Sequence, residues 1–228
     1  MPAERSIIVA ADGAPKGFLE LVEKIGVVDG LGGYKVSSEV TIGMTLLEAV
    51  GIVRDLSPGA VFIYDQKIAG TDILDTIVNF TRTKDRGDVA AILPFADPQV
   101  QERYTKELHD RGIKVIVDAE MTHPQQRHNK GDYRQRDAFR RMIDKAVELN
   151  VRDFMVRGNE PDKIAECVDY LNRTVGEDEY SLFGAGFTIA EAGQAAGESW
   201  HAIIGQGITE ANDPSVALLE YTQQLLAA

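Results

Sequence analysis

The sequence predicts a single-domain (β/α)8 barrel that spans residues 1–228. Short β-rich runs alternate with amphipathic helical segments along the chain, and eight such pairs fit into a length typical of a compact barrel. A doubly wound open sheet is the alternative, and it would carry a Gly-x-Gly-x-x-Gly pattern after its first strand. The chain instead has ADGAPKG at residues 11–17, which does not match this pattern.

Runs rich in Val, Ile and aromatic residues are the expected strands. They lie at residues 6–12, 32–40, 60–67, 88–94, 114–121, 152–158, 179–186 and 200–208. Each run is followed by an amphipathic segment that is typical of a helix. These expected helices lie at residues 16–25, 43–54, 72–84, 98–111, 133–149, 161–173, 190–197 and 212–226. Pro98, Pro161 and Pro214 mark the start of three helices, because proline fits the first helical turn.

The charge and composition narrow the range of functions. The chain is 44% hydrophobic and carries a formal net charge of -12. An acidic chain repels nucleic acid and anionic membranes, so we expect neither as a partner. No apolar stretch approaches the ~18 residues of a membrane-spanning helix. The single cysteine, Cys167, excludes an internal disulfide, and we therefore expect a reducing, cytoplasmic compartment.

Four alternating charges lie where a barrel of this kind carries its active site, at the carboxyl ends of the strands. Lys35 ends the second expected strand, Asp65 and Lys67 end the third, and Asp72 follows closely. Residues i and i+2 of a strand share a face, so Asp65 and Lys67 are expected to point into the barrel mouth together. A lysine between carboxylates stays protonated, and it could stabilise a carbanion and then protonate it. A purely structural ion-pair network is the alternative.

Glycines lie near the ends of the seventh and eighth expected strands, where such barrels bind phosphate. FGAGF at 183–187 contains Gly184 and Gly186, and IIGQG at 203–207 contains Gly205. Glycine lets backbone N–H groups approach an anion closely. The sequence therefore predicts a phosphate site at this edge of the barrel.

These residues resemble the orotidine 5′-monophosphate (OMP) decarboxylase family. The segment DQKIAGTDI (65–73) is similar to the family motif Asp-x-Lys-x-x-Asp, and EMTHP (120–124) is similar to Glu-Met-Ser-His-Pro. The resemblance covers nearly the whole chain in the expected order. It implies a (β/α)8 barrel that converts OMP to uridine 5′-monophosphate (UMP) and CO2 in pyrimidine biosynthesis, without a cofactor or a metal. It also implies a homodimer whose subunits share their active sites.

The resemblance assigns roles to individual residues. Lys67 would protonate the carbanion at C6, and Asp65 would face the departing carboxylate. Lys35 and Asp72 would hold the charged array in place and contact the ribose. The other contacts would go to Asp12 for the ribose, Thr122 for the pyrimidine, and Gly184, Gly186, Thr188, Gly205, Gln206 and Arg157 for the phosphate.

The chain departs from the family pattern at two positions. The second aspartate of the motif fits Asp72 only with an insertion of two residues, and Asp75 is the lesser candidate. Gln206 stands where the family has a phosphate-binding arginine. Arg157, or a cation in the polar loop at 125–135, is the expected replacement. That loop is either a lid or a solvated connection.

Two other functions remain open. A magnesium-dependent sugar-phosphate enzyme, such as 3-keto-gulonate 6-phosphate decarboxylase or hexulose phosphate synthase, would share the barrel and the strand 3 motif. Asp118, Glu120 and His123 could indicate a metal site, but they lack a regular ligand spacing. The second alternative is a relative that binds its ligand without turning it over.

Overall fold

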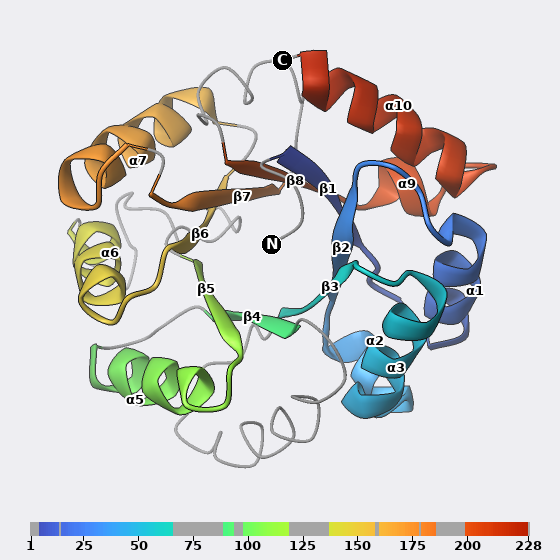
Figure 1. Cartoon of the computed structure of the whole chain (residues 1–228), viewed down its shortest axis with the longest axis horizontal. Coiled ribbons are helices and arrows are strands. Elements are labelled where there is room, and N and C mark those ends of the chain that lie inside the picture. Colours follow the sequence, from blue (N-terminus) through green and yellow to red (C-terminus); the bar gives the residue numbers. More distant parts are fainter. Residues whose placement is uncertain are drawn as a thin grey trace, which may run out of the picture.

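Eight parallel strands close into a barrel, which confirms the predicted fold class (Figure 1). The computed structural model describes residues 5–13, 15–65, 89–93, 98–118, 137–157, 160–177, 179–185 and 199–227. Each strand pairs with the next one along the chain, and β8 closes the ring by pairing with β1. The strands are β1 Arg5–Ala10, β2 Leu31–Val36, β3 Val61–Asp65, β4 Val89–Leu93, β5 Lys114–Asp118, β6 Asp153–Arg157, β7 Ser181–Ala185 and β8 Trp200–Ile204.

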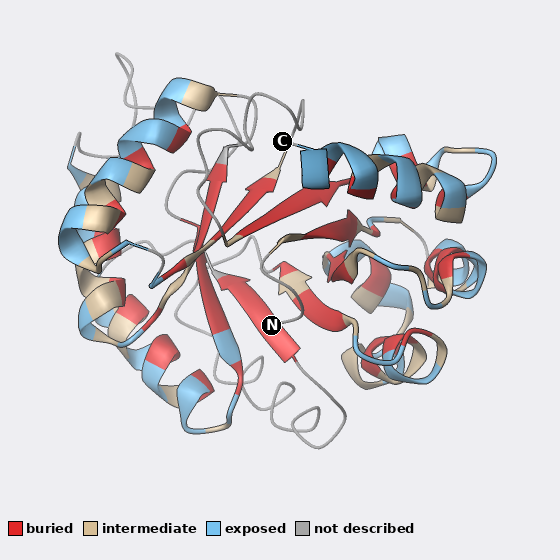
Figure 2. Cartoon of the chain, turned by 45° about the horizontal axis from the view of Figure 1, so that its top comes forward, coloured by how far each residue is buried: buried red, intermediate tan, exposed pale blue. Residues whose placement is uncertain are grey.

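Helices surround the barrel and turn their buried side toward it (Figures 1 and 2). They are α1 Pro15–Ile25, α2 Ser38–Gly43, α3 Leu46–Leu56, α5 Pro98–His109, α6 Ala138–Glu148, α7 Pro161–Thr174, α9 Gln206–Thr209 and α10 Pro214–Ala227. Pro98, Pro161 and Pro214 each begin a helix, as the sequence predicts. The helices expected at 72–84 and 190–197 lie outside the described residues. No helix in the described ranges is long and apolar enough to cross a membrane.

Two of the expected strands end earlier than predicted because a helix begins where each was expected to continue. The strand expected at 32–40 ends at Val36, and α2 follows it. The Ser37 side chain accepts a hydrogen bond from the Glu39 backbone N–H at 3.4 Å, which caps α2. The strand expected at 200–208 ends at Ile204, and Gln206 is the first residue of α9.

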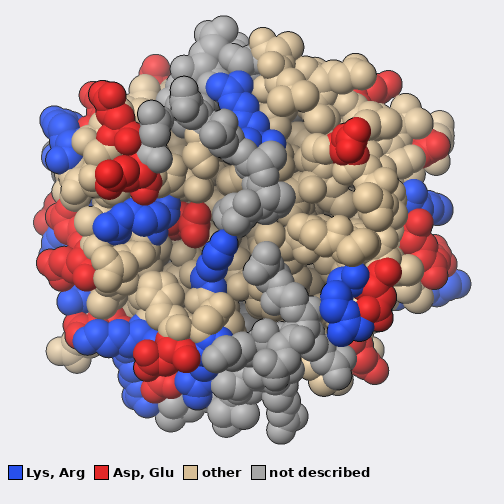
Figure 3. Space-filling view, in the orientation of Figure 1, with Lys and Arg blue, Asp and Glu red and all other residues tan. Residues whose placement is uncertain are grey.

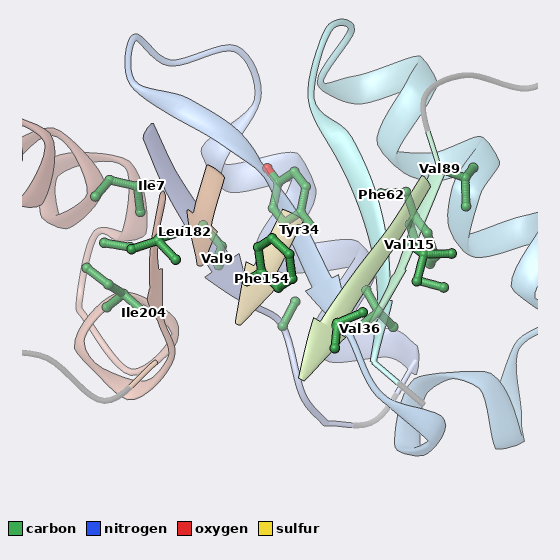
Figure 4. Packing of buried hydrophobic residues seen from close by; sticks show 14 of the residues in the cluster. Ile7, Val9, Tyr34, Val36, Phe62, Val89, Val115, Phe154, Leu182 and Ile204 are labelled. Atoms are coloured by element: carbon green, nitrogen blue, oxygen red, sulfur yellow. The ribbon is translucent and has the colours of Figure 1, made fainter. Parts of the chain in front are cut away.

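The strand side chains divide between two hydrophobic clusters. The smaller cluster consists only of strand residues and fills the barrel; it contains Ile8, Val61, Ile63, Ala90, Ile92, Ile116, Met155, Phe183 and Ile203. The larger cluster joins the outward strand faces to the helices (Figure 4). In β3, for example, Val61 and Ile63 point inward and Phe62 points outward. This alternation carries Asp65, two residues after Ile63, to the inner face.

A glycine in β2 allows close contact with β3 below the strand ends. Gly33 pairs with Val61, and a Cβ atom added at Gly33 would collide with the Val61 carbonyl oxygen. That oxygen belongs to the backbone of the neighbouring strand and cannot rotate away. Lys35, two residues further along β2, therefore depends on Gly33 for the geometry of its strand.

The seam between β1 and β8 contains a buried polar pair. Ser6 pairs with His201 in register, and the Ser6 Oγ lies 2.8 Å from the His201 Nδ1. Burial lowers the pKa of His201 to about 4. Beside this pair, Trp200 is the only tryptophan of the chain and is fully buried. The pair lies at the amino end of the strands, away from the predicted site.

Candidate active site

Three charged residues meet at the carboxyl ends of β1, β2 and β3. Lys35 is the penultimate residue of β2, and Asp65 is the last residue of β3. Asp12 lies two residues beyond the end of β1. The Lys35 Nζ donates to the Asp65 Oδ2 at 3.0 Å and to the two carboxylate oxygens of Asp12 at 3.2 and 3.1 Å. Parallel pairing of β1, β2 and β3 brings these positions together from distant parts of the chain.

The cluster of Lys35, Asp65 and Asp12 is buried at one end and open at the other. Lys35 is 7% exposed and Asp65 is 2% exposed, whereas the side chain of Asp12 is 44% exposed. Burial alone lowers the pKa of the Lys35 ammonium, but the Asp65 and Asp12 carboxylates outweigh it and leave the pKa above its usual value. Lys35 is therefore a fixed cation that orients both carboxylates.

The structure thus brings together three of the predicted site residues, while their chemical roles stay predictions. Lys67, Asp72 and its lesser alternative Asp75 lie outside the described residues. Thr122, Gly186, Thr188 and the polar loop at 125–135 also lie outside them.

The predicted phosphate residues that the structure describes follow three neighbouring strands. Arg157 ends β6, and Gly184 is a buried residue near the end of β7. Gly205 follows β8 directly and precedes Gln206, which is exposed at the start of α9. Gly184, Gly205 and Gln206 therefore lie at the same edge of the barrel as Lys35, with Gly184 on the strand opposite β3 and Gly205 beside β1.

One further carboxylate at this edge is buried and has no role in the predicted decarboxylase site. Asp118 is the last residue of β5 and is 1% exposed. In the sequence it follows the apolar run KVIV, which is the same signal that identified Asp65 after VFIY. From the sequence, Asp118 is a candidate only for a metal site with Glu120 and His123, whose spacing is irregular. Within the described residues, no group of three or more His, Cys, Asp or Glu side chains is arranged to hold a metal ion.

The surface charge is mixed on the face shown in Figure 3. Lys and Arg side chains lie interspersed with Asp and Glu side chains on that face. The described residues on this face form no continuous basic track of the kind that follows a nucleic-acid backbone.

Comparison with known proteins finds similarity in fold. No protein-family model matches the chain, and no curated protein matches its sequence. The OMP decarboxylase of Methanocaldococcus jannaschii, complexed with the inhibitor BMP, is 19% identical with a TM-score of 0.77, covering 99% of this chain and 99% of that one. The orotidine 5′-phosphate decarboxylase of Pyrococcus horikoshii OT3 is 19% identical with a TM-score of 0.73, covering 97% and 100%.

A structure named KGPDC, and not OMP decarboxylase, shares the same fold. The KGPDC of Streptococcus mutans is 13% identical with a TM-score of 0.67, and the match covers 98% of both chains. The TM-scores and coverages show that the chain has the fold of OMP decarboxylases and of KGPDC, while the sequence identities are low. They do not select one activity among these enzymes.

Proposed function

We propose that the protein is a decarboxylase that converts OMP to UMP and CO2 without a metal or an organic cofactor. The observation that carries the proposal is the buried ion-paired cluster of Lys35, Asp65 and Asp12 at the strand ends. Asp65 also begins the segment DQKIAGTDI, which supplies Lys67 two residues later. The fold shared with OMP decarboxylases supports the same function.

The proposed reaction needs one carboxylate that faces the substrate and one lysine that supplies a proton. Asp65 faces the carboxylate on C6 of the pyrimidine. The bond between C6 and that carboxylate breaks, CO2 leaves, and the electron pair stays on C6. Lys67 stabilises this carbanion and transfers a proton to it, which forms the C6–H bond of UMP. Lys67 then regains a proton from water.

Lys35 has a positioning role in this scheme. Its ammonium is bonded to both Asp65 and Asp12, so it fixes the direction of each carboxylate. Asp12 keeps an exposed side and can accept hydrogen bonds from the ribose hydroxyls. An array that is already oriented does not have to reorganise during the reaction, which is the main source of electrostatic catalysis.

The remaining contacts complete the proposal. The Thr122 hydroxyl contacts the pyrimidine. Asp72 reaches the active site of a partner subunit in a homodimer. The phosphate binds near Gly184, Gly186, Thr188, Gly205, Gln206 and Arg157. The single cysteine, Cys167, is buried and has no second cysteine in the chain with which to form a disulfide, which fits a cytoplasmic protein.

A magnesium-dependent sugar-phosphate decarboxylase is the second candidate. Asp118 is the specific observation in its favour, because it adds a second buried carboxylate at the same end of the barrel as Asp65. Carboxylate oxygens are the ligands that Mg²⁺ prefers. The fold shared with the KGPDC of Streptococcus mutans agrees with this alternative.

A metal-free assay tests the proposal. Purified protein is mixed with OMP and EDTA, and the loss of ultraviolet absorbance is followed with time. We expect turnover that Lys67→Ala abolishes. Lys16→Ala is the matched control, because Lys16 is an exposed lysine on α1 and its loss should leave turnover unchanged. Turnover of a sugar phosphate that requires Mg²⁺ would favour the second candidate. Nucleotide binding without turnover would indicate a non-catalytic relative.

A further inference from the structure

Asp118 points into the barrel at the same end as Asp65. It lies two residues after Ile116, which belongs to the cluster that fills the barrel. Asp65 has the same relation to Ile63. Because side chains at i and i+2 share a face, both carboxylates are directed toward the barrel axis. Both are almost completely buried, at 2% exposure for Asp65 and 1% for Asp118.

The strand register places the two carboxylates at the same height. Asp65 pairs with Ile92 of β4, and Ile92 pairs with Ile116 of β5. The strands of an eight-stranded barrel are tilted to its axis. The residue at a given height in the next strand therefore lies about one residue beyond the paired residue. Two strands after Asp65, the level position is therefore two residues beyond Ile116, which is Asp118.

The same count around the ring completes this layer of the barrel. Asp118 pairs with Met155 of β6, and Met155 pairs with Phe183 of β7. Two residues beyond Phe183 lies Ala185, which therefore belongs to the layer. Ala185 pairs with Ile203 of β8, and Ile203 pairs with Ile8 of β1. Two residues beyond Ile8 lies Ala10, which also belongs to the layer. The layer thus contains four side chains from alternate strands: Ala10, Asp65, Asp118 and Ala185. This is the layer arrangement of (β/α)8 barrels.

This layer has two acidic members and two small ones. Ala10 and Ala185 contribute only methyl groups to the layer, and both residues are only partly buried. A substrate group that lies at the barrel axis at this height would therefore face both Asp65 and Asp118. Lys35 is bonded to Asp65 and Asp12. Asp118 makes further interactions within the chain, as a buried charge must.

We propose that Asp118 is a second substrate-facing carboxylate, which disfavours the carboxylate-bearing substrate relative to the carboxylate-free product. The inference rests on the proposed function. In the ground state, the substrate carboxylate would lie beside two like charges in a site with little water. Loss of CO2 removes that repulsion, and UMP never experiences it. Asp118 thus lowers the affinity of the site for OMP, which carries the C6 carboxylate, relative to UMP, which lacks it.

Equilibrium binding of OMP and UMP tests this role. Titration calorimetry uses the Lys67→Ala protein, in which the proposed reaction does not consume OMP. With Asp118→Asn added, we expect OMP to bind about tenfold more tightly, as for removal of one partly screened like charge, and UMP to bind as before. Asp118→Leu removes the same charge in a second way.

A carboxylate at the other end of the barrel provides the matched control. Asp153 pairs with Ile116 in register and therefore also faces inward, but it lies at the start of β6. Burial raises the pKa of Asp153, although Lys114 and a hydrogen bond with Ser181 counteract it. Asp153→Asn should leave the dissociation constants of OMP and UMP unchanged.

Each outcome decides the inference. Tighter binding of OMP alone supports it. If both nucleotides bind and Asp118→Asn changes neither, or both equally, Asp118 does not face the C6 carboxylate, while the proposed function stands. If the protein with Asp118 intact binds neither nucleotide, the proposed function fails and the inference fails with it. If the Asp118 variants do not fold, the intact protein still decides, because OMP binding as tight as UMP binding overturns the inference.

Discussion

Replacing Lys35 with methionine removes the cation at the centre of the site and keeps the length of the side chain. The Lys35 Nζ lies 3.0 Å from the Asp65 Oδ2. At an effective dielectric constant near 20, this attraction is worth about 5 kcal/mol before desolvation is subtracted. Loss of Lys35 leaves the buried Asp65 carboxylate without this ion pair, and such changes cost roughly 3–5 kcal/mol of unfolding free energy.

Asp12 provides the comparison, because it binds the same ammonium in a solvated position. Its side chain is 44% exposed, and its contact with Lys35 is 3.1 Å long. At the dielectric constant of water the attraction falls to about 1 kcal/mol, and exposed pairs usually contribute no more than that. We therefore expect Asp12→Asn to reduce the unfolding free energy by about 1 kcal/mol or less.

Urea unfolding followed by circular dichroism measures both changes by linear extrapolation. A double-mutant cycle of Lys35→Met with Asp65→Asn should give a coupling energy of about 1–3 kcal/mol, because the two groups are in direct contact. Equal losses for Lys35→Met and Asp12→Asn, or a coupling energy near zero, would refute the reasoning from burial.

Three further predictions concern the barrel and its phosphate site. The native His201 has a pKa of about 4 against 6.5 when unfolded, so the unfolded chain binds its proton first as the pH falls. Between pH 6.5 and 4 the unfolding free energy should therefore decrease by up to about 3 kcal/mol, and His201→Gln should flatten this slope in urea unfolding; parallel slopes would contradict it. Gly33→Ala should lower the melting temperature, at a cost of about 1–3 kcal/mol or more, because the added methyl meets the backbone of β3. Gly17→Ala in α1 meets nothing within 4 Å and should instead stabilise the protein by about 0.5–1 kcal/mol; two changes of the same sign would count against this account. Gln206→Arg should lower the dissociation constant of UMP about fivefold to tenfold and leave that of uridine unchanged, because only UMP offers a phosphate to the added charge. Equal effects on both ligands would locate the phosphate elsewhere.

The alternating pattern of the strands predicts that Lys35 and Asp65 meet at the barrel mouth, whereas Asp12 is expected there only as a ribose contact implied by the family resemblance. Apolar runs such as VFIY fix which residues face inward, and they end in the charges that the barrel then gathers. The helix α2 was not predictable in this way. Val40, Thr41 and Ile42 are β-branched residues typical of strands, and the start of the helix depends on a cap at Ser37.

The relation of Asp118 to Asp65 could not be read from the sequence for a different reason. Each residue is recognisable as a charge that ends an apolar run, but their common height depends on the pairing register of β3 with β4 and of β4 with β5. Register is a property of neighbouring strands, and no local pattern in one strand contains it.

The seam between β1 and β8 has a consequence for how the protein is made. The hydrogen bond between Ser6 and His201 joins residues that are 195 positions apart, so the ring cannot close until β8 has left the ribosome. Until then β1 and β7 each present an unpaired edge that can join another chain. Trp200 pairs with Arg5 in this seam and is the only tryptophan, so its fluorescence should report the moment of closure.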